Sequence, residues 1–367
     1  MRWCLFLAAW ALLPATVQST ALAEEHRYLY VAVPGIRNYL EYGGHGLLVF
    51  DIDHGHKFLK RIPTAGLDVD GKPLNVKGII ASAKAGRVWI STIKTLTCLD
   101  LASEKILWER AYEGGCDRMS ITPDGKSIYL PSFEKAHWHV LDALTGDVLA
   151  KIVLNSGAHN TICGLDGRRA YLAGLNSPLL TIADTDTKSA IGSVGPFAAS
   201  IRPFTVNGKQ TLAFVNVNQL LGFEVGDLTT GKKLHRVEVE GFSQGPTKRH
   251  GCPSHGIGMT PDEKELWVVD AHNQRVHLFD ATVMPPRQKE SLKVRDEPGW
   301  ITFSRDGAYA YPSTGDVIET KTRAFVAALT DEHGGAVHSE KMIEIDFEDG
   351  RPVRTGDQFG LGRVTAP

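Results

Sequence analysis

"ITPDGKSIYLPS", residues 121–132, is the stretch that decides the fold of this chain of 367 residues. A short apolar run leads into Pro123-Asp124-Gly125, and a run rich in β-branched and aromatic residues follows. Such a turn between two apolar runs predicts two antiparallel strands joined by a tight connection. Looser copies of the pattern recur at residues 79–92, 163–174, 204–215, 258–269 and 303–313. Their spacing of about 40 residues is typical of the four-stranded blades of a β-propeller.

Two further strands follow the turn in each unit, as in "WHVLDALTG" at 138–146 and "DVLAKIVL" at 147–154. Six units are complete, and the N-terminal region supplies only the later strands of a seventh. We expect "KMIEIDFE", residues 341–348, to provide the missing first strand, because this closure leaves no open sheet edge. The sequence therefore predicts an all-β fold, a seven-bladed β-propeller closed by N- and C-terminal strands in one blade. Residues 24–367 are expected to form this single domain.

Residues 1–23 have the features of a cleavable secretory signal peptide. A positive Arg2 precedes an apolar run from Trp3 to Leu13, which is too short to span a bilayer, and Ala21-Leu22-Ala23 supplies small residues at a cleavage site. The sequence thus predicts a periplasmic or secreted protein. No later stretch is long and apolar enough to predict a transmembrane segment in the mature chain.

The repeat units resemble the YVTN family of β-propeller repeats, in which a Ser-Pro-Asp-Gly turn precedes a Tyr-Val-Thr-Asn-like strand. "TPDGKSIYLPS" at 122–132 and "TPDEKELWVVDAHN" at 260–273 match that pattern best. The resemblance covers nearly all of the mature chain and implies a seven-bladed propeller of the lactonase-like superfamily. Relatives in that family include lactonase-like proteins, binding proteins and scaffolds. No catalytic motif of the family is matched residue by residue, so the resemblance assigns no functional residue.

The overall charge narrows the classes of partner. A formal net charge of -2 and a pI near 6.7 argue against a nucleic-acid-binding protein, which needs a concentrated basic face. A small-molecule or carbohydrate ligand, or a protein partner, is compatible with this balance. In a propeller, such ligands are expected at the loops around one mouth of the central channel.

The repeat register predicts which side chains meet at that mouth. His255, His159 and Asp117 each lie seven residues before the turn position of their own unit, so we expect them at equal height around the channel. Neighbouring positions and the loops between second and third strands add further polar and aromatic groups. The predicted ligand-binding residues are His45, Asp117, Arg118, His137, Arg202, Arg249, Trp300 and His338.

Two kinds of chemistry are compatible with this cluster. In one interpretation His159 and His255 bind a divalent transition metal, because neutral imidazole is a good ligand for such ions. In the other, arginines hold a carboxylate or phosphate, while His159, His255 or Glu340 acts as a general acid or base. Lactone opening and β-elimination from an acidic sugar both fit the second interpretation, and the first adds metal assistance to such a reaction.

A third interpretation assigns no chemistry to the cluster. Polar residues at a channel mouth often only bond to neighbouring blades and to channel water. The protein would then be a non-catalytic interaction scaffold of the cell envelope. The sequence leaves open whether two long segments near the mouth, residues 34–46 and 241–254, act as lids.

Overall fold

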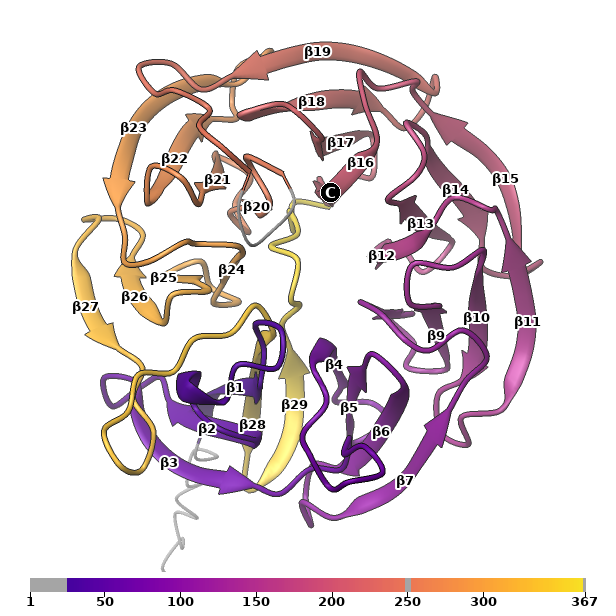
Figure 1. Cartoon of the computed structure of the whole chain (residues 1–367), viewed down its shortest axis with the longest axis vertical. Coiled ribbons are helices and arrows are strands. Elements are labelled where there is room, and N and C mark those ends of the chain that lie inside the picture. Colours follow the sequence, from indigo (N-terminus) through magenta and orange to yellow (C-terminus); the bar gives the residue numbers. More distant parts are fainter. Residues whose placement is uncertain (1–24, 248–251, 366–367) are drawn as a thin grey trace, which may run out of the picture.

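The computed structural model describes residues 25–247 and 252–365. Seven antiparallel sheets stand in a ring around a central channel, as Figure 1 shows. The fold predicted from the repeats, a closed all-β propeller with seven blades, is therefore confirmed. The predicted signal peptide, residues 1–23, lies outside the described residues, and the part of the chain that is described has no helix long and apolar enough to cross a membrane.

The strands follow the repeat order from the channel outward. Blade 1 contains β4 (Val76–Ser82), β5 (Arg87–Thr92), β6 (Thr95–Asp100) and β7 (Ile106–Ala111). Blade 2 contains β8 (Ser120–Ile121), β9 (Ser127–Pro131), β10 (His137–Asp142) and β11 (Val148–Val153). Blade 3 contains β12 (Ala158–Cys163), β13 (Arg169–Gly174), β14 (Leu180–Asp184) and β15 (Ser189–Val194).

The second half of the ring repeats the arrangement. Blade 4 contains β16 (Ile201–Val206), β17 (Leu212–Val217), β18 (Gly222–Asp227) and β19 (Lys232–Glu238). Blade 5 contains β20 (Ile257–Met259), β21 (Glu265–Asp270), β22 (Arg275–Asp280) and β23 (Arg287–Lys293). Blade 6 contains β24 (Ile301–Phe303), β25 (Tyr309–Pro312), β26 (Asp316–Glu319) and β27 (Phe325–Ala328).

Blade 7 joins the two ends of the chain. Its order is β29 (Arg351–Thr355), β28 (Met342–Glu348), β1 (Glu25–Val33), β2 (Gly46–Asp51) and β3 (Lys57–Ile62). β28 pairs with β1 from Glu25–Glu348 to Val31–Met342, so the C-terminal strand closes the ring as predicted. The fifth strand, β29, is an addition that the repeat pattern did not predict.

The repeated turn has a side-chain reason. Thr122 Oγ1 donates to Asp124 Oδ1 over 2.6 Å, and Gly125 follows at φ 76°, where a residue without Cβ is favoured. The Thr260–Asp262 pair repeats this bond at 2.7 Å in blade 5. The turn thus locks the first two strands of a blade in register, which is why it recurs in the sequence.

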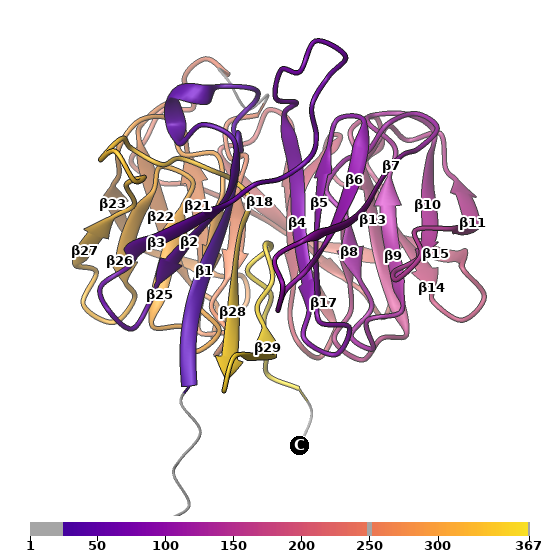
Figure 2. The ribbon, with the colours of Figure 1, turned by 90° about the horizontal axis from the view of Figure 1, so that it is seen from below.

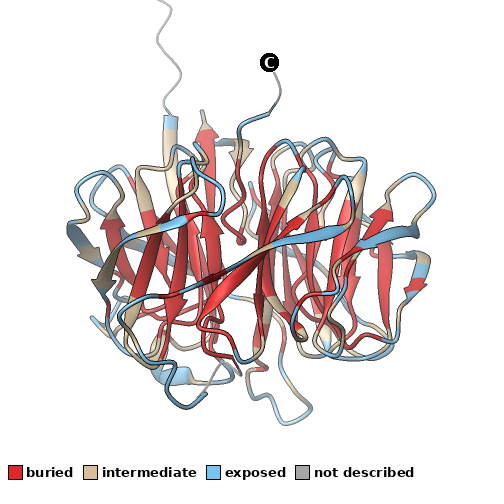
Figure 3. Ribbon diagram, turned by 90° about the horizontal axis from the view of Figure 1, so that it is seen from above, coloured by how far each residue is buried: buried red, intermediate tan, exposed pale blue. Residues whose placement is uncertain are grey.

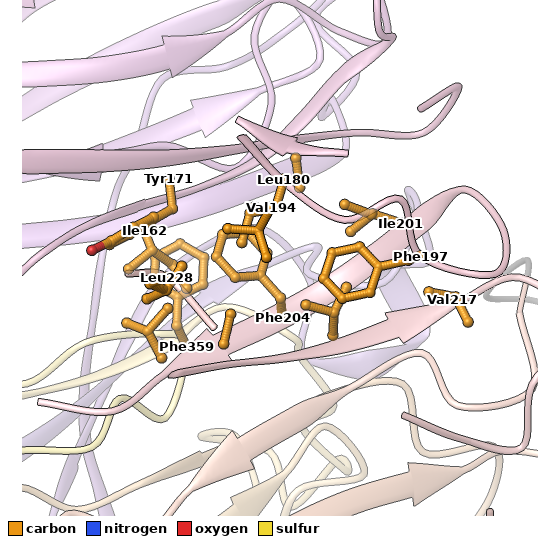
Figure 4. Close-up of a cluster of buried hydrophobic side chains, with 14 of the residues drawn as sticks. Ile162, Tyr171, Leu180, Val194, Phe197, Ile201, Phe204, Val217, Leu228 and Phe359 are labelled. Carbon is orange, nitrogen blue, oxygen red and sulfur yellow. The ribbon is translucent and has the colours of Figure 1, made fainter. Parts of the chain in front are cut away.

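Hydrophobic side chains between neighbouring blades form the core. Figure 3 shows inner strands buried and outer strands exposed, and Figure 4 shows the cluster between blades 3 and 4. Tyr171 of blade 3 and Phe204 of blade 4 are 0% and 1% exposed in that cluster. Phe359, from the C-terminal segment, packs against the same cluster. The core is therefore a ring of interfaces that also includes the end of the chain.

The C-terminal segment, residues 356–364, fills part of the channel, and we call it the plug. It runs from β29 across the channel in Figure 1, and the chain then leaves on the lower face in Figure 2. The Gly360 carbonyl accepts hydrogen bonds from Met259 N and Thr205 Oγ1, at 2.8 and 2.6 Å. Gln358 bonds to Ile79 N and Met119 O through its side chain. The plug therefore connects blades 1, 2, 4 and 5 across the channel.

The loop at residues 34–46 contains η1 (Leu40–Tyr42), a single turn of 3-10 helix. Figure 2 shows this turn on the upper face of the ring, opposite to the face from which the C-terminus leaves. Gly35 at the start of the loop has no room for a side chain, because a Cβ there would lie 1.8 Å from Ser339 Oγ. The loop is thereby held against the segment that precedes β28.

One buried histidine makes stability depend on pH. His56 Nε2 lies 3.0 Å from the Tyr311 hydroxyl, and burial, with Arg27 nearby, lowers the pKa of His56 from 6.5 to about 4 although Asp51 opposes the shift. Between pH 6.5 and 4 the unfolded chain binds a proton that the folded chain does not. We therefore expect the free energy of unfolding to fall by up to roughly 3 kcal/mol across this window as pH decreases.

Denaturant titrations at pH 7, 5.5 and 4.5 check this expectation. His56→Asn, whose side chain tolerates the φ of 59° at this position, should flatten the pH dependence over that range. His54→Asn is the matched control, because the His54 side chain is 70% exposed. Equal pH dependence in the wild type and His56→Asn would contradict the assignment.

Candidate functional site

A cavity of about 260 Å³ opens at the channel mouth, near the small end of the usual size of ligand pockets, ~300–1,000 Å³. First strands, the residues just before them and the loops around the mouth provide its walls, so that blades 1 to 5 and blade 7 all contribute. Five lysine and arginine side chains border the cavity: Arg37, Lys77, Arg118, Arg202 and Lys341. Only two carboxylates border it, those of Glu134 and Glu340. The cavity is consequently electropositive although the whole chain carries a small negative charge.

Five of the predicted site residues border this one cavity. They come from five blades and are Arg118, His159, Arg202, His255 and Glu340. Two more predicted residues lie directly behind them, Asp117 against His159 and Trp300 against Arg118. The equal register of the repeats explains this meeting, since each residue stands at the start of the first strand of its blade or just before it.

Three predicted ligand-binding histidines lie elsewhere. His45 Nε2 is 3.1 Å from the Ala65 carbonyl oxygen, His137 Nε2 is 3.1 Å from His139 Nε2, and the His338 ring stacks on Tyr42 at 4.4 Å. None of the three borders the cavity. Each of these histidines packs within its own blade or loop. The position of a residue in the sequence of a loop does not decide which way its side chain points, and for this reason the prediction missed these partners. Arg249 lies outside the described residues.

Asp117 and His159 form a buried carboxylate–imidazole pair. Asp117 Oδ2 lies 2.7 Å from His159 Nδ1, and Lys77 Nζ lies 3.3 Å from Asp117 Oδ1. Burial opposes the charge of Asp117, but His159, Lys77 and Arg118 outweigh it and hold the pKa of the carboxyl below its usual range. Burial lowers the pKa of His159, and Asp117 offsets this only in part. His159 is therefore neutral at pH 7, with Nδ1–H donated to Asp117.

This pair leaves the other ring nitrogen of His159 available. Nε2 has no hydrogen-bond partner among the described residues, and the side chain is 11% exposed at the cavity wall. With the proton on Nδ1, Nε2 carries a lone pair. A carboxylate that orients an imidazole in this way is the arrangement that proteins use for general bases.

Arg118 is the second buried centre. Its Nη2 donates to Glu340 Oε2 over 2.9 Å, its Nε donates to the Lys77 carbonyl oxygen over 3.2 Å, and its guanidinium lies 3.4 Å from the centroid of the Trp300 ring. Trp300 in turn donates Nε1–H to the carbonyl oxygen of Gln358 in the plug. The plug thus supports the site through a chain of contacts, from Gln358 through Trp300 to Arg118.

One donor of Arg118 is left over. Nη1 has no hydrogen-bond partner among the described residues, although Arg118 is only 3% exposed. Both amide atoms of Asn160, which pairs with Arg118 in an isolated parallel bridge, are also unpartnered within that part of the chain. Asn160 does not line the cavity, but Arg118 does, and a buried donor without an acceptor is costly. The cavity next to Arg118 therefore favours a ligand, or water in its absence, that brings an acceptor oxygen.

His255 and Arg202 line the cavity from blades 5 and 4. His255 Nδ1 lies 2.8 Å from the Gly299 carbonyl oxygen, which can only accept, so Nδ1 carries a proton and donates it. Arg202 Nε donates to Asn218 Oδ1 over 2.7 Å, which fixes the direction of its guanidinium. Both side chains are thus held by neighbours.

Lys77, Lys341 and Arg37 are cavity residues that the sequence prediction of the site did not include. Lys77 directly precedes Gly78, which holds the same register position in blade 1, so the repeat alignment contained a signal for it. Lys341 begins the predicted closing strand. Arg37 lies in a long loop that the sequence places at the channel mouth, but it was not among the predicted ligand-binding residues.

The interpretation of His159 and His255 as ligands of a divalent metal gains no support from the structure. Within residues 25–247 and 252–365, no group of three or more His, Cys, Asp and Glu side chains could hold a metal ion. The physical reason is the surroundings of the two histidines. Cationic side chains such as Lys77, Arg118 and Arg202 border the same cavity as the two histidines, and their charge disfavours a divalent cation.

Comparisons with known proteins show no family. The chain matches no protein-family model and has no significant match to a curated protein sequence. Among solved structures, hydrazine synthase of Kuenenia stuttgartiensis is similar in fold, with 14% sequence identity and a TM-score of 0.46, over 67% of this chain and 96% of that chain. A likeness at this level carries no argument about function. The resemblance to the YVTN repeats stays a prediction.

Proposed function

We propose that this protein binds a small anionic ligand, of the class of carboxylic and sugar acids, in the channel-mouth cavity. The observation that carries the proposal is the unpartnered Nη1 of Arg118, almost fully buried beside a cavity bordered by five cationic side chains. A carboxylate is the acceptor that a planar guanidinium binds best. The partial burial of the site strengthens such a contact relative to one at the surface.

The chemistry that we propose for a bound ligand is proton transfer by His159. Asp117 orients the imidazole so that Nε2 can accept a proton from a molecule in the cavity. The proton could come from a carbon atom next to a carboxylate of the ligand, or from a water molecule that attacks a lactone carbonyl. The first reaction would be a β-elimination and the second a hydrolysis. Arg118 and Arg202 would stabilise the negative charge that develops on the ligand oxygens in either case.

We also propose that the protein acts outside the cytoplasm. The proposal rests on Arg2, the apolar run and the Ala21-Leu22-Ala23 site, all of which lie outside the described residues. N-terminal sequencing of the protein from its natural host should begin at Glu24. A mature protein that retains residues 1–23 would contradict this proposal.

Isothermal titration calorimetry with lactate, citrate and D-glucuronate tests the binding proposal. We expect at least one of these anions to bind with an affinity that decreases as salt is added, because the contact is ionic. Arg202→Gln should weaken that binding about tenfold, since it removes one cation that borders the cavity. Arg236→Gln is the matched control, because Arg236 lies on outer strand β19 with its side chain 42% exposed.

The outcomes separate the two function classes. Binding of an anion that Arg202→Gln weakens and Arg236→Gln leaves unchanged supports a ligand site. No binding of any of the three probes, together with no effect of either substitution on thermal stability, would instead favour the non-catalytic scaffold. That result would contradict the proposed function.

A further inference from the structure

We propose that Lys341 is an imine-forming residue, whose Nζ condenses with the aldehyde or ketone carbon of an anionic carbonyl compound bound in the cavity. An α-keto acid is the simplest member of this ligand class. The inference rests on the proposed function, because the carboxylate of such a ligand must first bind to the cationic wall. It goes further by assigning a covalent step to a side chain that the acid–base chemistry of His159 does not use.

The position of Nζ carries the inference. Lys341 borders the cavity but is only 3% exposed, and Nζ lies 2.6 Å from the Gly35 carbonyl oxygen and 2.9 Å from Glu340 Oε2. A neutral amine has two N–H groups and one lone pair. The Gly35 carbonyl oxygen and Glu340 Oε2 accept both N–H groups, which leaves the lone pair of Nζ for a carbon atom in the cavity.

The surroundings of Lys341 favour the neutral amine. Burial, with Arg118 and Lys77 nearby, lowers the pKa of Lys341 from 10.5 to about 7, although Glu340 opposes the shift. An ordinary lysine is almost wholly protonated at pH 7 and is a poor nucleophile. Desolvation next to another cation is a known way for proteins to make a lysine nucleophilic.

The neighbours of Lys341 match the other needs of the reaction. Arg118 contacts the same Glu340 Oε2 atom, at 2.9 Å, so the cation that would hold the ligand carboxylate is one contact away from the amine. Glu340 is also within 2.9 Å of Nζ and can move a proton to or from it. An α-keto acid places its carbonyl carbon directly beside its carboxylate, which suits this short separation.

The proposed step balances without any further reactant. The Nζ lone pair forms a C–N bond to the carbonyl carbon, and the carbonyl oxygen takes up a proton to become a hydroxyl group. This hydroxyl group then leaves as water after a second protonation, while Nζ loses its protons through Glu340. The sum is one amine and one carbonyl compound giving one imine and one water molecule, with no change in oxidation state.

Trapping with sodium borohydride tests the proposal on the full chain. We expect incubation with pyruvate and borohydride to add one reduced pyruvate unit, and peptide mapping to place it on Lys341. Lys341→Arg, which keeps N–H donors next to Glu340 but has no nucleophilic amine, should abolish the adduct. Lys72→Arg, at an exposed position in the loop before β4, is the control and should trap as the wild type does.

A second measurement separates failure of this inference from failure of the proposed function. Lactate has the carboxylate of pyruvate but no carbonyl carbon for the amine, so its binding reports the anion site alone. Binding of lactate without a pyruvate adduct would overturn the imine proposal and leave the anion site standing. Absence of both would overturn both, and an adduct confined to Lys77 or spread over exposed lysines would also overturn the role of Lys341.

Discussion

Replacing Arg118 by Met is expected to abolish binding of small carboxylates and to lower the free energy of unfolding by about 3–5 kcal/mol. Arg118 and Glu340 are both nearly buried, with side chains 4% and 8% exposed, and their atoms meet at 2.9 Å. Removing the guanidinium takes away the ion pair of Glu340 with Arg118 and leaves its ion pair with Lys341. It also removes the cation that stacks on Trp300. Urea titration measures the stability and calorimetry with lactate measures the binding.

A double variant separates the two effects of that change. Arg118→Met with Glu340→Gln removes both charges, so it should recover much of the lost stability but none of the binding. Arg110→Met is the surface control. Arg110 lies on the exposed strand β7, its side chain is 42% exposed, and it forms an ion pair with Asp147. Surface ion pairs contribute about 0–1 kcal/mol, so this control should change little. If Arg118→Met retained wild-type stability and binding, Arg118 would have neither role.

Gly360→Ala in the plug is expected to have the second large effect. A Cβ at this position would lie 2.9 Å from Gly258 Cα, which is backbone and cannot move aside cheaply. The Gly360 carbonyl also accepts two hydrogen bonds from blades 5 and 4. We therefore expect a loss of about 2–4 kcal/mol in the free energy of unfolding and weaker binding of lactate. The binding falls because the plug supports Trp300, which supports Arg118.

Gly350→Ala is the matched control for this prediction. Both glycines have left-handed φ values, 60° at Gly360 and 73° at Gly350, but a Cβ at Gly350 would meet nothing within 4 Å. The control therefore measures the conformational cost alone, about 1–2 kcal/mol. Equal losses in the two variants would show that the contact of the plug with blade 5 is unimportant.

The number of blades and the closure of the ring could be predicted because both are written in local patterns. Turns of the Pro-Asp-Gly kind repeat at the spacing of the blades. The hydrogen bond between Thr122 and Asp124 shows why these residue types recur, since it holds the turn in shape. Closure followed from counting strands, since a blade that lacks its first strand must take one from elsewhere. The same reasoning failed at the C-terminus, because the plug has no repeat and its hydrogen bonds reach blades 1, 2, 4, 5 and 6.

The candidate site could be predicted in part for the same reason. Equal register placed His159, His255 and Asp117 around one mouth, with Arg118 as the neighbour of Asp117, and the structure has His159, His255 and Arg118 bordering one cavity. Register says nothing about which atoms meet. The side chain of Asp117 turns to His159 and Lys77, so it orients an imidazole behind the cavity wall. His45 and His338, predicted from loops without a repeat register, point to other partners.

The sequence by itself determined the all-β ring of seven blades and the height at which the reactive residue types stand, because turns and strand alternation are local properties. Only the tertiary structure decided which of those groups share a cavity, that the plug supports Trp300 and Arg118, and that Lys341 lies buried beside Glu340. Burial and charge proximity arise between residues hundreds of positions apart, such as Arg118 and Glu340. Those two quantities set the chemistry of the site.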